Sequence, residues 1–314
     1  MLNNSSLSPL GGQAPDDSLR GKIAVVAGAT RGAGRGIALA LGSAGATVYC
    51  TGRSVRGATS DLGRVETIDE TAEGVTARGG IGIAVQVDHT SEAQVKALFE
   101  RISREQNGSL DLLVNDVWGG DSLSEWGIPF WEQSLDKGLK MLERAVFTHI
   151  ITSRYGVPLM VRQRRGLVIE ITDGKTLDYR GNFFYDLAKT TVIRLAVAMA
   201  AELRDRGVTA LALTPGFLRS EAVLDHFGVT ESNWRDAVAK DPYFAGSETP
   251  HYIGRAVVAL ACDPGVGGKG GQALATWDLA REYGFTDVDG TQPDWATFFR
   301  DRQQQEKGQE QARS

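Results

Sequence analysis

Short, nearly continuous apolar runs alternate with longer amphipathic segments along most of the chain. Seven runs rich in β-branched residues are expected to be strands, at residues 23–27, 47–51, 81–87, 110–114, 167–171, 208–213 and 272–275. The intervening segments are expected to be helices, at residues 34–43, 61–78, 91–106, 137–163, 184–206 and 249–261. Strands that are apolar on both faces are typical of a parallel sheet buried between two helical layers. The pattern therefore predicts an α/β fold with a doubly wound parallel sheet of about seven strands.

The same pattern predicts one domain with two loose ends. Residues 1–20 are rich in Ser, Gly, Pro and Asp, and residues 301–314 are rich in Gln and Glu, so both are expected to be flexible. Residues 21–300 are expected to form a single domain. Within it, residues 118–136 and 217–247 carry aromatic side chains outside the strand–helix rhythm. They are either surface loops with aromatic rings packed beneath them, or a substrate lid and pocket wall.

Composition and charge exclude several classes of protein. The net charge is −5 and no basic stripe is present, which disfavours binding to nucleic acid or to an anionic membrane. The longest apolar run, residues 187–203, is too short and too charged to span a bilayer. The N-terminus lacks the features of a signal peptide, and the two cysteines suggest no disulfide framework or metal site. We therefore expect a soluble, cytoplasmic protein.

A glycine-rich turn follows the first predicted strand and leads into the first helix. It reads Gly28-Ala29-Thr30-Arg31-Gly32-Ala33-Gly34. Glycines at these positions permit a tight turn and let backbone N–H groups approach a diphosphate at the positive end of the helix. The turn thus predicts a Rossmann-type dinucleotide site that includes Thr30 and Ala33.

The end of the second strand bears on which dinucleotide is bound. A site that selects NAD carries an acidic residue there for the ribose 2′-hydroxyl, whereas this chain has Gly52 and Arg53. Together with Arg31, Arg53 could clamp a 2′-phosphate, although both arginines could equally be solvated surface residues. We predict NADP(H).

Asp88 and His89 follow the third strand. At this position Asp88 could accept a hydrogen bond from the adenine amino group. It could also form a turn or cap the next helix. We assign both residues to the predicted cofactor site.

Tyr185 and Lys189 are the candidate catalytic pair. They are four residues apart at the start of an apolar helix, so their side chains share one helical face. An ammonium group beside a phenol lowers the phenol's pKa toward working pH. That is suited to a proton donor to a developing alkoxide, although this spacing also arises by chance.

These motifs occur in the order found in the short-chain dehydrogenase/reductase family, which the chain resembles over roughly residues 20–280. The family's Asn-Asn-Ala-Gly is similar to Asn115-Asp116-Val117-Trp118, and its Pro-Gly is Pro215-Gly216-Phe217-Leu218. The C-terminal stretches at 278–284 and 287–290 are similar to one particular member of the family. The resemblance implies that Asn115 borders the nicotinamide ribose and that Lys189 holds its hydroxyls. It also places Phe217 and Leu218 beside the carboxamide.

Two catalytic positions of the family are altered. The family's Ser corresponds to Asp173 or Thr172, which lie 12 and 13 residues before Tyr185, and its helical Asn corresponds to Glu143. An ionised Asp173 only accepts hydrogen bonds and raises the pKa of the tyrosine, whereas a protonated Asp173 or an inward Thr172 could donate. Alternatively, Asp173 caps a turn and the chemistry is lost.

We therefore predict an NADP(H)-dependent oxidoreductase that interconverts a carbonyl and an alcohol, with Tyr185 as the proton donor. The aromatic segments suggest an apolar or aromatic small-molecule substrate. The alternative is a non-catalytic NADP(H)-binding protein that kept the fold and lost turnover. The resemblance further implies a homodimer or homotetramer that pairs through the helices at 137–163 and 184–206.

Overall fold

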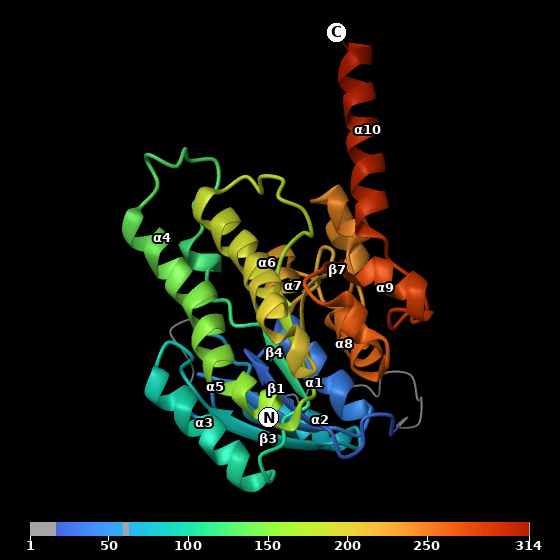
Figure 1. The fold of residues 1–314 in the computed structure, drawn as a ribbon. Helices are drawn as coiled ribbons and strands as arrows, with labels where there is room; N and C mark the ends of the chain where they lie inside the picture. Colours follow the sequence, from blue (N-terminus) through green and yellow to red (C-terminus); the bar gives the residue numbers. More distant parts are fainter. Residues whose placement is uncertain (1–16, 59–62, 314) are drawn as a thin grey trace.

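A parallel seven-stranded sheet forms the centre of the molecule (Figure 1). The computed structural model describes residues 17–58 and 63–313. Within them the strand order is β3-β2-β1-β4-β5-β6-β7, and every neighbouring pair is parallel. The strands are β1 Ile23–Ala27, β2 Thr47–Gly52, β3 Ile81–Gln86, β4 Leu112–Asn115, β5 Gly166–Ile171, β6 Val208–Thr214 and β7 Ala273–Ala275. The doubly wound parallel sheet predicted from the sequence is confirmed.

Helices cover both faces of this sheet. Helices α1 (Gly32–Ser43), α2 (Ile68–Ala77) and α8 (Pro250–Cys262) share one apolar core cluster with the central strands. The opposite face is covered by α3 (Glu92–Glu105), α5 (Thr148–Gln163) and α6 (Phe183–Leu203). Because both faces are covered, all residues of β1 and β2 are buried, as the apolar runs predicted.

The sheet reverses its winding at β1. This strand pairs with β2 on one side and with β4 on the other, so the chain leaves its carboxyl end in two directions. In such sheets the crevice beyond the carboxyl ends at the reversal is where ligands bind. The loops after β1 and β4 therefore border the crevice where a ligand is expected.

The predicted helix at 137–163 is interrupted. It consists of α4 (Leu135–Leu142), a π-helical turn at Glu143–Phe147, and α5. A π turn inserts one extra residue into a helix and shifts the direction of the side chains that follow. The turn begins at Glu143, one of the predicted catalytic residues.

The C-terminal end is helical. Helix α10 (Trp295–Arg313) includes residues 301–313, which were expected to be a flexible tail, and it extends away from the body (Figure 1). Its first turns are anchored by aromatic rings, and Tyr243 donates a hydrogen bond to Glu306 at 2.8 Å. The sequence shows no apolar period there because most of the later turns are polar.

The other short helices are α7 (Glu221–Phe227), α9 (Thr276–Tyr283) and the 3₁₀ turns Asp121–Leu123, Arg204–Arg206, Trp234–Ala239, Pro242–Gly246 and Val266–Lys269. Most of the predicted leader, residues 1–16, lies outside the described residues. No helix in residues 17–58 or 63–313 combines the length and the apolar character needed to cross a bilayer.

Candidate active site

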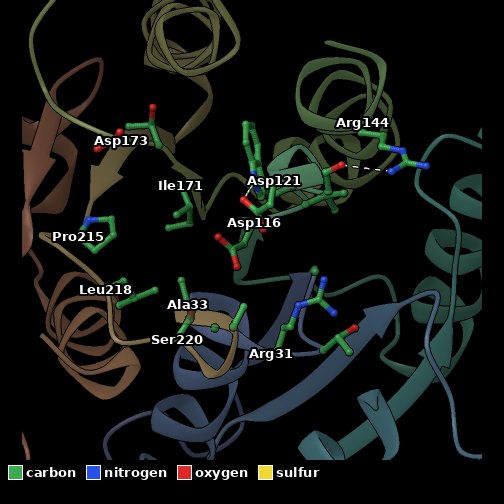
Figure 2. A pocket seen from close by; sticks show the side chains of 18 of the residues that line it. Arg31, Ala33, Asp116, Asp121, Arg144, Ile171, Asp173, Pro215, Leu218 and Ser220 are labelled. Carbon is green, nitrogen blue, oxygen red and sulfur yellow. Dashed lines mark hydrogen bonds between the residues drawn. The ribbon is translucent and has the colours of Figure 1, made fainter. Parts of the chain in front are cut away.

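A cavity of about 680 Å³ lies at the carboxyl ends of the strands (Figure 2). Most of the predicted site residues line it. They are Gly28, Thr30, Arg31, Gly32, Ala33, Arg53, Asp88, His89, Thr172, Asp173, Tyr185, Lys189, Pro215, Gly216, Phe217 and Leu218. Gly34, Asn115 and Glu143 were also predicted, but they are not among the lining residues.

Gly28 and Gly34 are required by packing within the glycine-rich turn. Gly28 has a φ of +93°, and a Cβ atom there would lie 2.7 Å from the carbonyl oxygen of Asp116. A Cβ atom on Gly34 would lie 2.3 Å from the carbonyl oxygen of Gly28. Both glycines thus allow the start of α1 to approach the ends of β1 and β4, the packing role that dinucleotide folds give to one of their glycines.

The first N–H of α1 already holds an anionic group. Gly32 N–H donates to a carboxylate oxygen of Glu221 at 2.7 Å. Glu221 is the first residue of α7, within the aromatic segment 217–247. A helix N-terminus that faces a cavity and binds a carboxylate is suited to a phosphate group. The residues present therefore fit a dinucleotide diphosphate, with Glu221 as its stand-in.

Asp88 and His89 both line the cavity and both have partners inside the protein. Asp88 accepts hydrogen bonds from the backbone and hydroxyl of Thr90, which lower its pKa although burial opposes this. The His89 ring lies 2.8 Å from the hydroxyls of Thr51 and Thr152, and burial lowers its pKa to about 4. Asp88 thus forms a local turn while remaining open to a ligand, and His89 is a neutral core side chain.

The structure does not support the predicted ribose contact of Asn115. Its side chain is fully buried and donates to Ser153 at 2.9 Å and to Glu170 at 2.7 Å. Glu170 also lies 2.6 Å from the ring of His149, whose other nitrogen lies 3.0 Å from the carbonyl of Val117. Asn115 therefore belongs to a buried network that holds the loop after β4. The sequence signal for this network was Glu170, a single acidic residue within the apolar strand β5.

Asp116, the residue after Asn115, faces the cavity (Figure 2). Burial raises the pKa of its carboxyl to about 7, although Lys189 and the N–H of Gly34 oppose this. The sequence contained a signal for Asp116, because it stands where the family motif has its second Asn.

The catalytic pair is positioned by the cap of α6. Asn182 accepts a hydrogen bond from the backbone N–H of Tyr185, which starts the helix and fixes the tyrosine in its first turn. The Tyr185 hydroxyl donates to Asp173 at 2.7 Å. Burial, the charge of Asp173 and this hydrogen bond raise the pKa of Tyr185 well above its ordinary value.

Thr172 and Asp173 are distinguished by their partners. Thr172 is 2% exposed, and its hydroxyl donates to the backbone carbonyl of Lys189 at 2.8 Å. The hydroxyl proton of Thr172 is thus used in a hydrogen bond to the backbone of helix α6. Asp173 is exposed and is the residue that meets the Tyr185 hydroxyl.

Lys189 lies beside an aromatic ring that the family motif lacks. Its ammonium is 4.0 Å from the ring centre of Trp118, at the motif's Gly position, and 5.6 Å from that of Tyr185. The indole N–H of Trp118 donates to Asp121 at 2.6 Å. Burial lowers the pKa of Lys189, while the charges of Asp173, Asp116 and Asp121 oppose that change. Trp118 thus contacts both members of the catalytic pair.

Glu143 does not line the cavity. It begins the π turn, and its carboxylate accepts a hydrogen bond from Lys140 at 2.5 Å. Arg144 and Thr148 line the cavity instead, and Arg144 donates to the carbonyl of Gly119 at 3.2 Å. Glu143 was assigned by matching residues 141–144 to the family motif, and the neighbouring residue is the one that reaches the cavity.

The two aromatic segments contribute only part of their rings to the cavity. Trp118, Phe217 and Tyr243 line it, whereas Trp131 is 72% exposed. Two further lining rings, Trp295 and Phe299, come from the start of α10 and were missed because they lie within the predicted domain but outside its two aromatic segments.

Comparisons with known proteins agree with this geometry. The family model for short chain dehydrogenase matches residues 22–226. Dehydrogenase/reductase SDR family member 1 from Mus musculus is 38% identical over 283 residues, 87% of this chain and 85% of the relative. 3-oxoacyl-[acyl-carrier-protein] reductase FabG from Staphylococcus aureus is 32% identical over 203 residues, 64% of this chain and 76% of the relative.

A solved structure adds to these relatives. A Beutenbergia cavernae protein, assigned as an NAD(P)-dependent gluconate 5-dehydrogenase and solved with bound NADP at low occupancy, is 26% identical. It superimposes with a TM-score of 0.65 over 83% of this chain and 97% of its own. With the sheet order and the ordered motifs, these matches show that the chain belongs to the short-chain dehydrogenase/reductase family of oxidoreductases.

Proposed function

We propose that the protein is an NADP(H)-dependent reductase that converts a carbonyl compound to an alcohol, with Tyr185 as the proton donor. One observation carries this proposal: Tyr185 and Lys189 line the same cavity as the glycine-rich turn. A side chain able to deliver a proton thus lies in the cavity that fits a dinucleotide.

The residues that line the cavity support the following assignment of cofactor contacts. Gly28 and residues 30–33 would hold the diphosphate once Glu221 withdraws. Arg31 and Arg53 would hold the 2′-phosphate, Asp88 the adenine, and Lys189 the ribose hydroxyls. The loop Pro215–Leu218 would border the carboxamide. The cofactor supplies a hydride to the carbonyl carbon when bound.

The electrostatics of Tyr185 favour one direction of reaction. A phenol whose pKa is raised stays protonated at neutral pH, which is the form needed to donate a proton to the carbonyl oxygen. Removing a proton from an alcohol needs the phenolate, which forms only at higher pH. We therefore propose reduction as the reaction at neutral pH, with oxidation favoured in alkaline solution.

A second candidate, a non-catalytic NADP(H)-binding protein, is favoured by one contact. The Tyr185 hydroxyl is bound to Asp173, which competes with a substrate carbonyl for the same proton. Oxidation of NADPH across a panel of carbonyl compounds separates the two. Turnover with any compound supports the reductase, whereas cofactor binding without turnover supports the second candidate.

The cofactor preference is the first prediction. Arg31 and Arg53 line the cavity, and the chain carries no acid at the end of β2, so NADPH should bind more tightly than NADH. Losing one charge-assisted contact in Arg53→Ala should cost about 1.5–3 kcal/mol, or roughly 10- to 150-fold in NADPH affinity. Fluorescence titration of both cofactors measures this.

Glu221→Gln provides the control for that titration. It weakens the competing contact to Gly32 without touching the arginines, so it should strengthen NADPH and NADH binding alike. Equal affinity of the wild-type protein for the two cofactors would rule out the 2′-phosphate clamp.

We also propose a homodimer or homotetramer that pairs through the two helical segments named from the sequence. Exposed apolar side chains lie on the first segment at Leu139, Phe147 and Ile150, and on α6 at Leu187. Val192 and Leu203 of α6 are 2% and 7% exposed, so they pack inside the protomer. Light scattering should give a multiple of the 33.8 kDa chain mass, and Phe147→Asp should shift it toward that mass. A monomer in the wild type would contradict this.

A further inference from the structure

Of the five carboxylates that line the cavity in the described part of the chain, three lie beside lining aromatic rings. Asp173 accepts a hydrogen bond from the Tyr185 hydroxyl, and Asp121 accepts one from the indole N–H of Trp118. Asp241 caps the 3₁₀ turn Pro242–Gly246 and also lines the cavity. Because each carboxylate sits beside a lining aromatic ring, an incoming substrate meets negative charge on several sides.

The cations of the cavity do not balance these carboxylates at the reacting end. Arg31 and Arg53 lie at the cofactor end, beside the glycine-rich turn and β2. Lys189 lies over the ring of Trp118 and is assigned to the cofactor ribose. Arg144 is bound to the carbonyl of Gly119 and lies across the cavity from Asp173 in Figure 2. Arg180 lies outside the lining residues, donates to the backbone carbonyl of Asp173 and is paired with Asp186 at 2.8 Å, although its charge also acts on Tyr185. Among the described residues that line the cavity, each cation near Tyr185 is thus already bound to a protein group or assigned to the cofactor.

The walls of this end are aromatic. Trp118 and Tyr185 meet edge to face, with ring centres 5.4 Å apart, on one side. On the other side the ring centre of Trp295 lies 5.7 Å from that of Phe217 and 6.4 Å from that of Tyr243. Aromatic faces bind apolar and aromatic bodies, and they attract cations but not anions.

We propose that the substrate is an aromatic or otherwise apolar carbonyl compound without negative charge, and that a positive charge on it strengthens its binding. This inference rests on the proposed reductase function and narrows its substrate class. Negative potential at the reacting end repels a carboxylate or phosphate on the substrate, while the aromatic walls accept an uncharged or cationic body.

The test compares three aryl ketones that differ only in the para substituent. The substituents are methyl, carboxylate and trimethylammonium. With NADPH, kcat/KM for the carboxylate compound should be lower than for the methyl compound by about tenfold or more. The trimethylammonium compound should equal or exceed the methyl compound. The differences should shrink as salt concentration rises, because salt screens partly exposed charges.

Two variants assign the effect to the carboxylates. Asp121→Asn and Asp241→Asn keep the size and the hydrogen-bond acceptor, so each should raise the carboxylate-to-methyl ratio of kcat/KM by about threefold. Asp236→Asn makes the same charge change at an exposed carboxylate of the turn Trp234–Ala239 that does not line the cavity, and it should leave the ratio as in the wild type. An unchanged ratio in both cavity variants would overturn the proposal.

The outcomes also separate this inference from the proposed function. Reduction of all three ketones at equal kcat/KM would leave the reductase in place and refute the charge selection. If no ketone is reduced, the proposed function fails, and tryptophan fluorescence still reports equilibrium binding of the three compounds to the NADPH-loaded protein. Tighter binding of the carboxylate compound than of the methyl compound would then refute the charge selection independently.

Discussion

Tyr185→Phe is expected to lower the turnover of any accepted carbonyl compound by about 10²–10⁴-fold, the contribution of a general acid. The substitution removes only the hydroxyl that donates to Asp173 and keeps the ring that contacts Trp118. The affinity for NADPH should therefore stay close to that of the wild type. Steady-state kinetics and a fluorescence titration of the cofactor measure the two quantities.

Tyr179→Phe is the matched control for this prediction. Tyr179 is 65% exposed and does not line the cavity, so its loss of a hydroxyl should leave turnover unchanged. If Tyr185→Phe turns over as fast as the wild type, the proton must come from another group, and Asp173, which accepts from the Tyr185 hydroxyl, is the first candidate.

Asp173→Ser is expected to raise the rate of carbonyl reduction by about tenfold or more, because it removes the charge-assisted hydrogen bond between Tyr185 and Asp173. In the wild type, a substrate carbonyl must displace the carboxylate from the Tyr185 hydroxyl. A serine could instead donate its own proton to the carbonyl oxygen, as the family's Ser does by resemblance. Initial rates of NADPH oxidation measure the change.

The same substitution should change the pH dependence of alcohol oxidation. Asp173 raises the pKa of Tyr185, so its removal lowers that pKa and lets the phenolate form at lower pH. The rise of oxidation rate with pH should therefore move to lower pH in Asp173→Ser. Asp178→Ser, a carboxylate loss in the same loop but bound to Thr176, should leave the profile in place. Identical profiles for the wild type and Asp173→Ser would contradict this coupling.

Much of the fold was predictable because buried strands require apolar residues, which form recognisable runs in the sequence. Strands covered on both faces must be apolar throughout, so β1 and β2 stood out as continuous runs. The glycine-rich turn and the pair Tyr185/Lys189 were found because their chemistry depends on spacing within one local element. The structure brings both to a single cavity, which spacing alone does not establish.

Other parts of the site depend on tertiary contacts that leave no local pattern. Glu143 was selected by matching residues 141–144 to the family motif, whereas its neighbour Arg144 lines the cavity. Trp295 and Phe299 lie at the start of α10, outside the two aromatic segments, and only the tertiary fold brings them to the cavity. Asn115 was assigned to the cofactor, although its amide is held by Glu170 from the neighbouring strand.

The central claim is that this cavity transfers a hydride from NADPH to a carbonyl while Tyr185 delivers the proton. Single-turnover mixing of the NADPH-loaded protein with an uncharged aryl ketone tests it most directly, by the absorbance of reduced nicotinamide and by analysis of the alcohol. The account predicts one alcohol formed for each NADPH consumed, and a rate lowered about 10²–10⁴-fold in Tyr185→Phe. Tight NADPH binding without oxidation across the carbonyl panel, in both the wild type and Asp173→Ser, would contradict it.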